Sequence, residues 1–106
     1  MTFFKPEDMN TRELFPGCRA KLLHTEKMTI SQVSLDAGAV VPEHAHEHEQ
    51  VSNVIDGKFE FTVGGKTHIL EPGQIAVIPP NVPHVGKALT DCYIVDVFSP
   101  VREDYK

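Results

Sequence analysis

Residues 58–63 constrain the fold most strongly, because large apolar and charged or polar side chains alternate there without a break. A strand turns successive side chains to opposite faces, so one face of this segment lies on a core and the other meets water. Asp56-Gly57 precedes it and Gly64-Gly65 follows it, and the second pair has the composition of a two-residue hairpin turn. The pattern predicts a half-buried antiparallel strand. The side chains expected to face the core are Phe59, Phe61 and Val63.

Short strand-like segments of this kind recur from about residue 22 to residue 98, and turn residues separate them. No convincing helix, repeat or low-complexity segment interrupts them. Strands at such short and regular spacing predict an all-β chain, folded as an antiparallel β-barrel or double-stranded jelly roll. A barrel of this size has a mouth and an interior that can hold a small ligand. The other expected strands are 28–35, 39–41, 51–55, 66–70, 74–78, 85–90 and 91–98.

The two ends of the chain lack the strand-like pattern of its middle. Residues 1–20 contain Pro6, Pro16 and Gly17 and no clear periodicity, which predicts an irregular N-terminal arm. Residues 99–106 form a charged C-terminal tail. A chain of 106 residues forms one domain, and a domain of this size buries only about two-thirds of its unfolded surface.

Charge limits the partners. Ten basic and fifteen acidic residues leave a formal charge of −5, which repels nucleic acid and anionic membrane surfaces. We therefore expect neither as a partner, and any anionic ligand needs a local positive centre.

The expected compartment follows from what the sequence lacks. The first ten residues contain no apolar run of signal-peptide length, and no later run approaches a membrane span. Cys18 and Cys92 are too few and too far apart for a disulfide framework, so we expect buried or idle thiols. Together these features predict a soluble cytoplasmic protein.

Three of the six histidines fall within residues 44–50, His-Ala-His-Glu-His-Glu-Gln. On a strand His44 and His46 point the same way, and Gln50 keeps the same parity. A solvated surface loop is the alternative. Two histidines in phase between strand-like segments, with His84 as a possible third imidazole, favour a metal site.

The spacing of these residues resembles the two motifs of the cupin family. The resemblance implies a small β-barrel that holds one divalent metal ion on His44, His46, Gln50 and His84. Three positions depart from the family pattern: Gln50 replaces an acidic ligand, Asn81 a glycine and Ala88 an asparagine. The residues that carry the resemblance are Gly38, His44, His46, Gln50 and Gly57 in the first motif, and Gly73, Pro79, Asn81 and His84 in the second.

The uncharged Gln50 has a chemical consequence. Three neutral imidazoles and one amide leave the full double-positive charge of the ion in the site, which favours a Lewis acid acting on an anionic substrate. A non-haem iron oxygenase usually has a carboxylate ligand, although cupin oxygenases with three histidines exist. Such a site accepts Zn, Ni, Fe, Mn or Co. His48 and Glu49 are the alternative ligands to Gln50.

A second group of candidate residues lies near the C-terminus. Asp96 has the parity of Cys92, Ile94 and Phe98, so its carboxylate faces the interior if those apolar residues do. A buried carboxylate beside a cation is a candidate catalytic acid or base. The alternative is a structural ion pair between Asp96 and Arg102. The planar guanidinium of Arg102 suits a carboxylate ligand, its alternative being an exposed surface charge.

Residues 44–50 together with the ending 96–104 resemble the pectin-degradation branch of the cupin family. That resemblance implies that Asp96 and Arg102 are catalytic and that Phe98 and Arg102 bind substrate. The implied reaction converts 4,5-unsaturated uronate monomers, from pectin or alginate, into linear 4-deoxy-5-keto uronates, so the partner is a small anionic sugar acid. A cupin dioxygenase for an enol or dicarbonyl substrate and a non-catalytic sugar- or metabolite-binding cupin are the alternatives.

We also expect a homodimer. An early strand within residues 1–30, supplied to a second subunit, would cover an exposed sheet edge.

Overall fold

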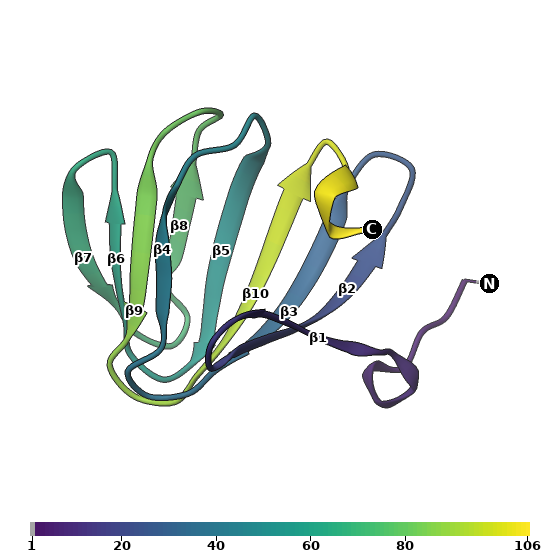
Figure 1. The fold of residues 1–106 in the computed structure, drawn as a ribbon, viewed down its shortest axis with the longest axis horizontal. Helices are drawn as coiled ribbons and strands as arrows, with labels where there is room; N and C mark the ends of the chain where they lie inside the picture. Colours follow the sequence, from purple (N-terminus) through teal and green to yellow (C-terminus); the bar gives the residue numbers. More distant parts are fainter. Residues whose placement is uncertain (1) are drawn as a thin grey trace.

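Two antiparallel sheets face each other in this computed structural model, which describes residues 2–106 (Figure 1). The six-stranded sheet has the order β1-β2-β3-β10-β5-β8, and the four-stranded sheet has the order β4-β9-β6-β7. The predicted antiparallel jelly-roll barrel is confirmed. The strands of the first sheet are β1 (Thr11–Phe15), β2 (Cys18–His24), β3 (Thr29–Leu35), β10 (Cys92–Ser99), β5 (Glu49–Asp56) and β8 (Ile75–Ile78). Those of the second are β4 (Val40–His44), β9 (His84–Ala88), β6 (Phe59–Val63) and β7 (Lys66–Leu70). Two short 3-10 helices, η1 (Pro6–Asp8) and η2 (Glu103–Tyr105), lie near the chain ends.

The alternating segment behaves as expected. Phe59 and Phe61 are 4% and 6% exposed, and they belong to the core between the sheets. Gly64 and Gly65 both have positive φ, 56° and 81°, as the two-residue turn between β6 and β7 requires. Short-range pattern therefore determines both the face and the turn of this hairpin.

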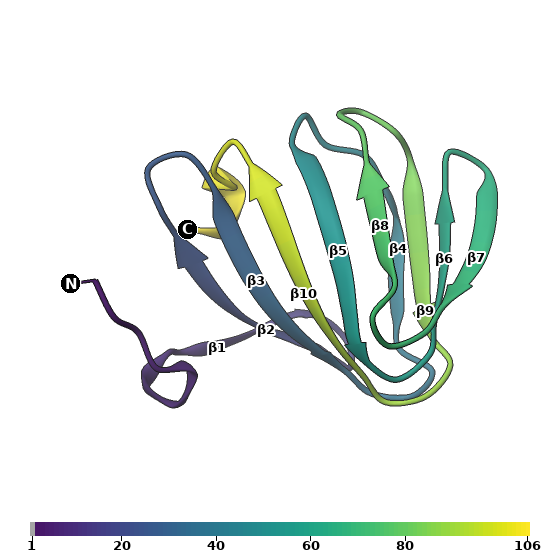
Figure 2. The same cartoon turned by 180° about the vertical axis from the view of Figure 1, so that it is seen from behind.

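The prediction that residues 1–20 are irregular is wrong for the second half of that stretch. β1 and the first half of β2 form a hairpin there, with Arg12 opposite Ala20. β1 lies at a sheet edge, its first three residues are polar and exposed, and its last two are only half-buried, so it shows no apolar periodicity. Its strand conformation comes from backbone pairing with β2. Residues 2–10 form an arm, which projects from the barrel (Figures 1 and 2).

The early strands pair within their own chain. β1 joins β2 and β2 joins β3 in one sheet. The homodimer itself stays a prediction.

Both thiols are buried and unpaired, as expected. Burial raises the pKa of the Cys18 thiol to about 11, so it stays protonated at neutral pH. Among residues 2–106 no helix is long and apolar enough to span a membrane.

Gly57 and Gly38 offer a matched test of the turns, because both have a φ of +87°. A Cβ on Gly57 would collide with the backbone oxygen of Asp91 and lie 2.9 Å from the Cα of Cys92. A Cβ on Gly38 would meet no atom within 4 Å.

We expect Gly38→Ala to lower the free energy of unfolding by about 1–2 kcal/mol, the cost of a left-handed residue with a side chain. Gly57→Ala should cost about 1–3 kcal/mol more, because the backbone of β10 must also move. Urea unfolding of the two variants measures the difference. If both variants lose the same free energy of unfolding, the close approach of Gly57 to the start of β10 adds no cost to a side chain at that position.

Candidate metal centre and its cavity

One cavity between the two sheets collects most of the candidate residues. Its wall combines an apolar part, from the core, with a polar part near the open end of the barrel. Residues far apart in sequence meet there, because the sheets bring β4, β5, β9 and β10 to the same interior. The polar and aromatic residues at this end are His44, Gln50, Ser52, His84, Asp96, Phe98, Arg102 and Tyr105.

Three histidines converge at this cavity. His44 ends β4 and lies opposite His84, the first residue of β9. His46 joins them from the loop before β5, so the prediction that His44 and His46 share one strand is wrong, although their side chains do meet. One ring nitrogen from each lies within 4.8 Å of the other two. This is a spacing at which three imidazoles can bind one ion.

Backbone carbonyls orient all three rings. Nδ1 of His44 lies 2.8 Å from the carbonyl oxygen of Pro42, Nδ1 of His84 lies 2.9 Å from that of Val82, and Nδ1 of His46 lies 3.0 Å from that of His48. A carbonyl only accepts, so each Nδ1 carries the proton and each Nε2 keeps a lone pair. The arrangement therefore presents three lone pairs to the same region.

The rings near the core are also neutral. Burial lowers the pKa of His84 to about 4, and it lowers the pKa of His46 as well, where the positive charge of Arg102 adds to the effect. Nε2 of His84 is buried without a hydrogen-bond partner. A neutral imidazole with an unpartnered lone pair is the form that binds a transition metal.

Gln50 completes the group. It is 6% exposed, and its Oε1 lies 3.0 Å from Nε2 of His46 while its Nε2 donates to Oγ of Ser52. With Nδ1 of His46 protonated, the amide oxygen and Nε2 are two acceptors face to face. A cation between them removes that conflict, and ligand atoms about 2.1 Å from one ion at right angles lie about 3 Å apart. The donor set thus fits a divalent metal ion.

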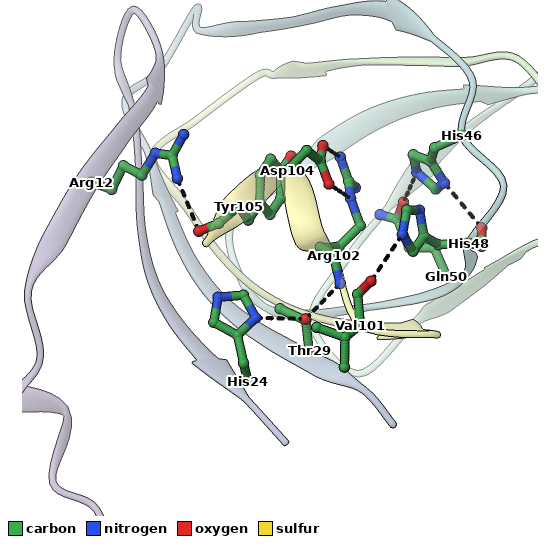
Figure 3. Close-up of polar contacts among 10 residues, drawn as sticks. All are labelled: Arg12, His24, Thr29, His46, His48, Gln50, Val101, Arg102, Asp104 and Tyr105. Atoms are coloured by element: carbon green, nitrogen blue, oxygen red, sulfur yellow. Dashed lines mark hydrogen bonds and ion pairs between the residues drawn. The ribbon is translucent and has the colours of Figure 1, made fainter. Parts of the chain in front are cut away.

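The two alternative ligands lie elsewhere. Glu49 is exposed, and by strand parity it points to the opposite face of β5 from Gln50. His48 is buried, but its Nε2 donates to the carbonyl oxygen of Val101 at 3.2 Å (Figure 3). Gln50 is therefore the better candidate for the fourth ligand.

Asp96 faces the cavity, as its parity with Ile94 and Phe98 predicts. Burial raises the pKa of its carboxyl to about 6, while hydrogen bonds from Ser52 and Gln50 and the charge of Arg102 partly oppose the rise. Its Oδ1 is buried without a partner. The carboxyl is thus desolvated and has one oxygen free for a ligand.

Arg102 is neither an exposed charge nor the ion-pair partner of Asp96. Only 4% of it is exposed, and its Nε and Nη2 donate to the two carboxylate oxygens of Asp104 at 3.0 and 2.7 Å (Figure 3). The guanidinium carbon lies 4.0 Å from the ring centre of Tyr105 and 4.7 Å from that of Phe98. Nη1 is buried and has no partner. The fork is thereby held rigidly with one donor unused.

Sequence reasoning missed the residues that support this group. Ser52 shares the parity of Gln50 on β5, so that signal was present. Thr29 accepts from the backbone N–H of Arg102 at 2.9 Å, and Tyr105 packs on the guanidinium. No local pattern indicates either contact, because 73 residues separate Thr29 from Arg102 and the tail lacks periodicity.

We expect His84→Ala to abolish stoichiometric binding of Zn²⁺ or Ni²⁺, because it removes an unpartnered lone pair from the centre of the cluster. Gln50→Ala should weaken binding about 10–100-fold, since a single weak ligand is lost. Metal content after gel filtration and titration against a competing chelator measure both effects.

His68→Ala is the matched control, since His68 is an exposed histidine of β7. It should bind one ion like the parent protein. Full metal content in His84→Ala would show that the cluster is not the site.

Comparison with known proteins agrees with the fold. The family model described as a cupin domain matches residues 31–98. An uncharacterized protein of Streptomyces coelicolor is 28% identical over 85 residues, covering 79% of this chain and 81% of its own. The structure of KdgF from Halomonas sp. superposes with a TM-score of 0.93 at 34% identity, over 100% of this chain and 99% of KdgF. An RmlC-like cupin from Shewanella frigidimarina gives a TM-score of 0.95 at 31% identity, over 100% and 96% of the two chains. Since the family model spans more than half of the sequence and includes all three histidines, the chain belongs to the cupin family.

Proposed function

We propose that this cupin converts 4,5-unsaturated uronate monomers into linear 4-deoxy-5-keto uronates. The observation that carries the proposal is one cavity lined by an unpartnered carboxylate oxygen and an unpartnered guanidinium nitrogen, next to three imidazoles that are placed to hold a metal ion. The structural likeness to KdgF supports the same reaction as the resemblance of residues 44–50 and 96–104 implies.

The substrate is a monoanion, and the chain carries a net charge of −5. Binding therefore needs a positive centre inside the barrel. Arg102 supplies one: Asp104 uses two of its donors, and the buried Nη1 is left for a carboxylate. Such a charge-assisted hydrogen bond, made away from water, orients the sugar acid as well as holding it.

A divalent ion held by His44, His46, His84 and Gln50 would supply Lewis-acid stabilisation of negative charge on an oxygen next to the substrate carboxylate. The proton transfers fall to Asp96. Its carboxylate accepts the proton of the anomeric hydroxyl, C1 becomes an aldehyde, and the bond from C1 to the ring oxygen breaks. The electron pair stays on the former ring oxygen as an enolate.

Ketonisation completes the reaction. Asp96 returns its proton to C4, the enolate becomes the C5 ketone, and the net change is an isomerisation without a co-reactant. A carboxyl with a pKa of about 6 both accepts and returns a proton near neutral pH. Phe98, which is 3% exposed, and Tyr105 exclude water from one side of the cavity.

We expect Asp96→Asn to lower kcat for ring opening about 10²–10⁴-fold, the usual contribution of a general base. Its metal content should stay the same, because the change keeps the shape of the side chain and leaves the three imidazoles in place. NMR of the unsaturated monomers, corrected for spontaneous opening, follows the product. Asp8→Asn removes a surface carboxylate and should turn over normally.

Three results would contradict this assignment. If fully metallated Asp96→Asn turns over substrate at the wild-type rate, Asp96 is not the general base. Substrate-dependent oxygen uptake without ring opening would identify a dioxygenase instead, and binding without any turnover would identify a non-catalytic module.

Arg102→Lys should raise KM about tenfold or more with a smaller effect on kcat, because an ammonium group cannot pair with Asp104 and present a further fixed donor. Arg12→Lys is the control. Arg12 also holds the tail, through a 2.9 Å hydrogen bond to the carbonyl oxygen of Tyr105, but it lies outside the cavity. If both variants change KM equally, Arg102 acts only by positioning the tail.

A further inference from the structure

His48 lies among the candidate metal ligands in the sequence, but its side chain is used elsewhere. The residue is 7% exposed, and Nε2 of its ring donates to the carbonyl oxygen of Val101 at 3.2 Å (Figure 3). Its Nδ1 is buried without a partner, which costs stability. The polar contact that the ring does make joins the loop before β5 to the C-terminal tail.

This contact holds one side of a single peptide group. The carbonyl of Val101 and the N–H of Arg102 belong to that group, and the N–H donates to Oγ1 of Thr29 at 2.9 Å. β10 has ended before this point, at Ser99, so the group lies outside the sheet ladder. The backbone that carries Arg102 is instead clamped between His48 and Thr29, which come from different parts of the fold (Figure 3).

His48 is in turn tied to a histidine of the cluster. Nδ1 of His46 donates to the carbonyl oxygen of His48 at 3.0 Å, and the carbonyl oxygen of His46 accepts from the N–H of Asn81 at 2.7 Å. Residues 45–48 lie between β4 and β5 and belong to neither strand, so bonds of this kind shape the loop. Fixing Nε2 of His46 at a metal centre fixes its ring, and through Nδ1 it also fixes the carbonyl of His48.

The cluster and the guanidinium are close enough for a shift in this loop to matter. The ring centre of His46 lies 5.7 Å from that of Phe98, and the guanidinium carbon of Arg102 lies 4.7 Å from the same phenylalanine ring. Asp104 offsets the charge of the guanidinium, so a cation on the imidazoles does not simply repel it. A displaced backbone at Arg102 would therefore change where its free Nη1 lies relative to the imidazoles.

We infer that His48 is a positioning residue that couples the metal centre to Arg102. When the imidazoles hold a metal ion, the loop holds the peptide group before Arg102, and Nη1 has one fixed place in the cavity wall. Without the ion, the loop and the peptide group can move together. The coupling is reciprocal, so an anion on Arg102 should raise metal affinity by the factor by which the metal raises anion affinity. That Nη1 receives a substrate carboxylate rests on the proposed function, whereas the coupling does not.

Hydrogen exchange of the Arg102 amide, followed by NMR, tests the coupling without any substrate. This N–H is the donor to Thr29, and an amide in a chain terminus exchanges through local opening. Loading the parent protein with Zn²⁺ should slow its exchange about 3–10-fold, the effect of strengthening one hydrogen bond. The amides of β7, an edge strand of the other sheet, are the internal reference and should change less than about twofold.

Three variants identify the link. His48→Phe keeps a ring and removes the donor, so the Arg102 amide should no longer respond to Zn²⁺, although one ion still binds. His48→Gln places an amide N–H near the former Nε2 and should restore most of the response. His24→Phe is the matched control, because His24 contacts Oγ1 of Thr29 at 2.8 Å but is not part of the loop. It should respond to Zn²⁺ like the parent protein.

Binding of glucuronate, a saturated uronate, connects the coupling to the site. Zn²⁺ also attracts the carboxylate directly, so the informative quantity is the difference between variants. Titration calorimetry should show that Zn²⁺ tightens binding several-fold less in His48→Phe than in the parent protein, and that His48→Gln recovers the loss. In turnover, His48→Phe should raise KM more than it lowers kcat.

The parent measurement is decisive and does not depend on a variant folding. An Arg102 amide that ignores Zn²⁺ in the parent protein would overturn the inference, and so would a folded His48→Phe that responds as the parent does. If the amide responds but glucuronate does not bind the zinc-loaded parent, the coupling stands and the proposed function is contradicted.

Discussion

Three backbone carbonyls orient the histidine cluster on which the candidate site depends. Each accepts a hydrogen bond from Nδ1 of one histidine, so each Nε2 keeps its lone pair and the three lone pairs point toward one another. Burial keeps His46 and His84 neutral, and it leaves Nε2 of His84 without a partner. Lone pairs that point toward one another repel, and a cation bound between them turns that repulsion into attraction. The pairing of β4 with β9 places His44 opposite His84, and the loop before β5 brings His46 to them.

The second constraint is the burial of charge. Asp96 and Arg102 both lie in the cavity wall, yet the ion pair of Arg102 is with Asp104 on its own tail. Each of the two groups therefore retains an unpartnered atom, Oδ1 on the carboxylate and Nη1 on the guanidinium. Buried polar atoms normally find partners, so these two exceptions, together with Nε2 of His84 in the same cavity, fit the proposed ligand, which has an acidic and a proton-donating group.

The two-residue period of a strand links the cavity to the outer face. On β5 Gln50 points inward and Val51 outward, and on β10 Asp96 points inward and Val97 outward. The same two central strands thus carry Gln50 and Asp96 on the cavity side and aliphatic side chains on the outer side.

Local pattern was sufficient wherever neighbouring residues decide the outcome. The alternation of residues 58–63, the turn at Gly64-Gly65 and the inward parity of Asp96 all follow from strand period and turn chemistry, and the structure confirms them. β1 was missed because an edge strand with polar side chains depends on its neighbour for its conformation.

The candidate site also has features that local sequence predicts and features that depend on tertiary structure. The sequence by itself determined which residue types could bind a metal ion, because histidines in phase and a conspicuous Gln50 are local features. Only the tertiary structure decided that His46 reaches the cluster from a loop, that Asp104 and not Asp96 pairs with Arg102, and that Thr29 and Tyr105 hold that arginine in place. Those contacts depend on how β3, β10 and the C-terminal tail pack together, and no spacing along the chain encodes a distance through space.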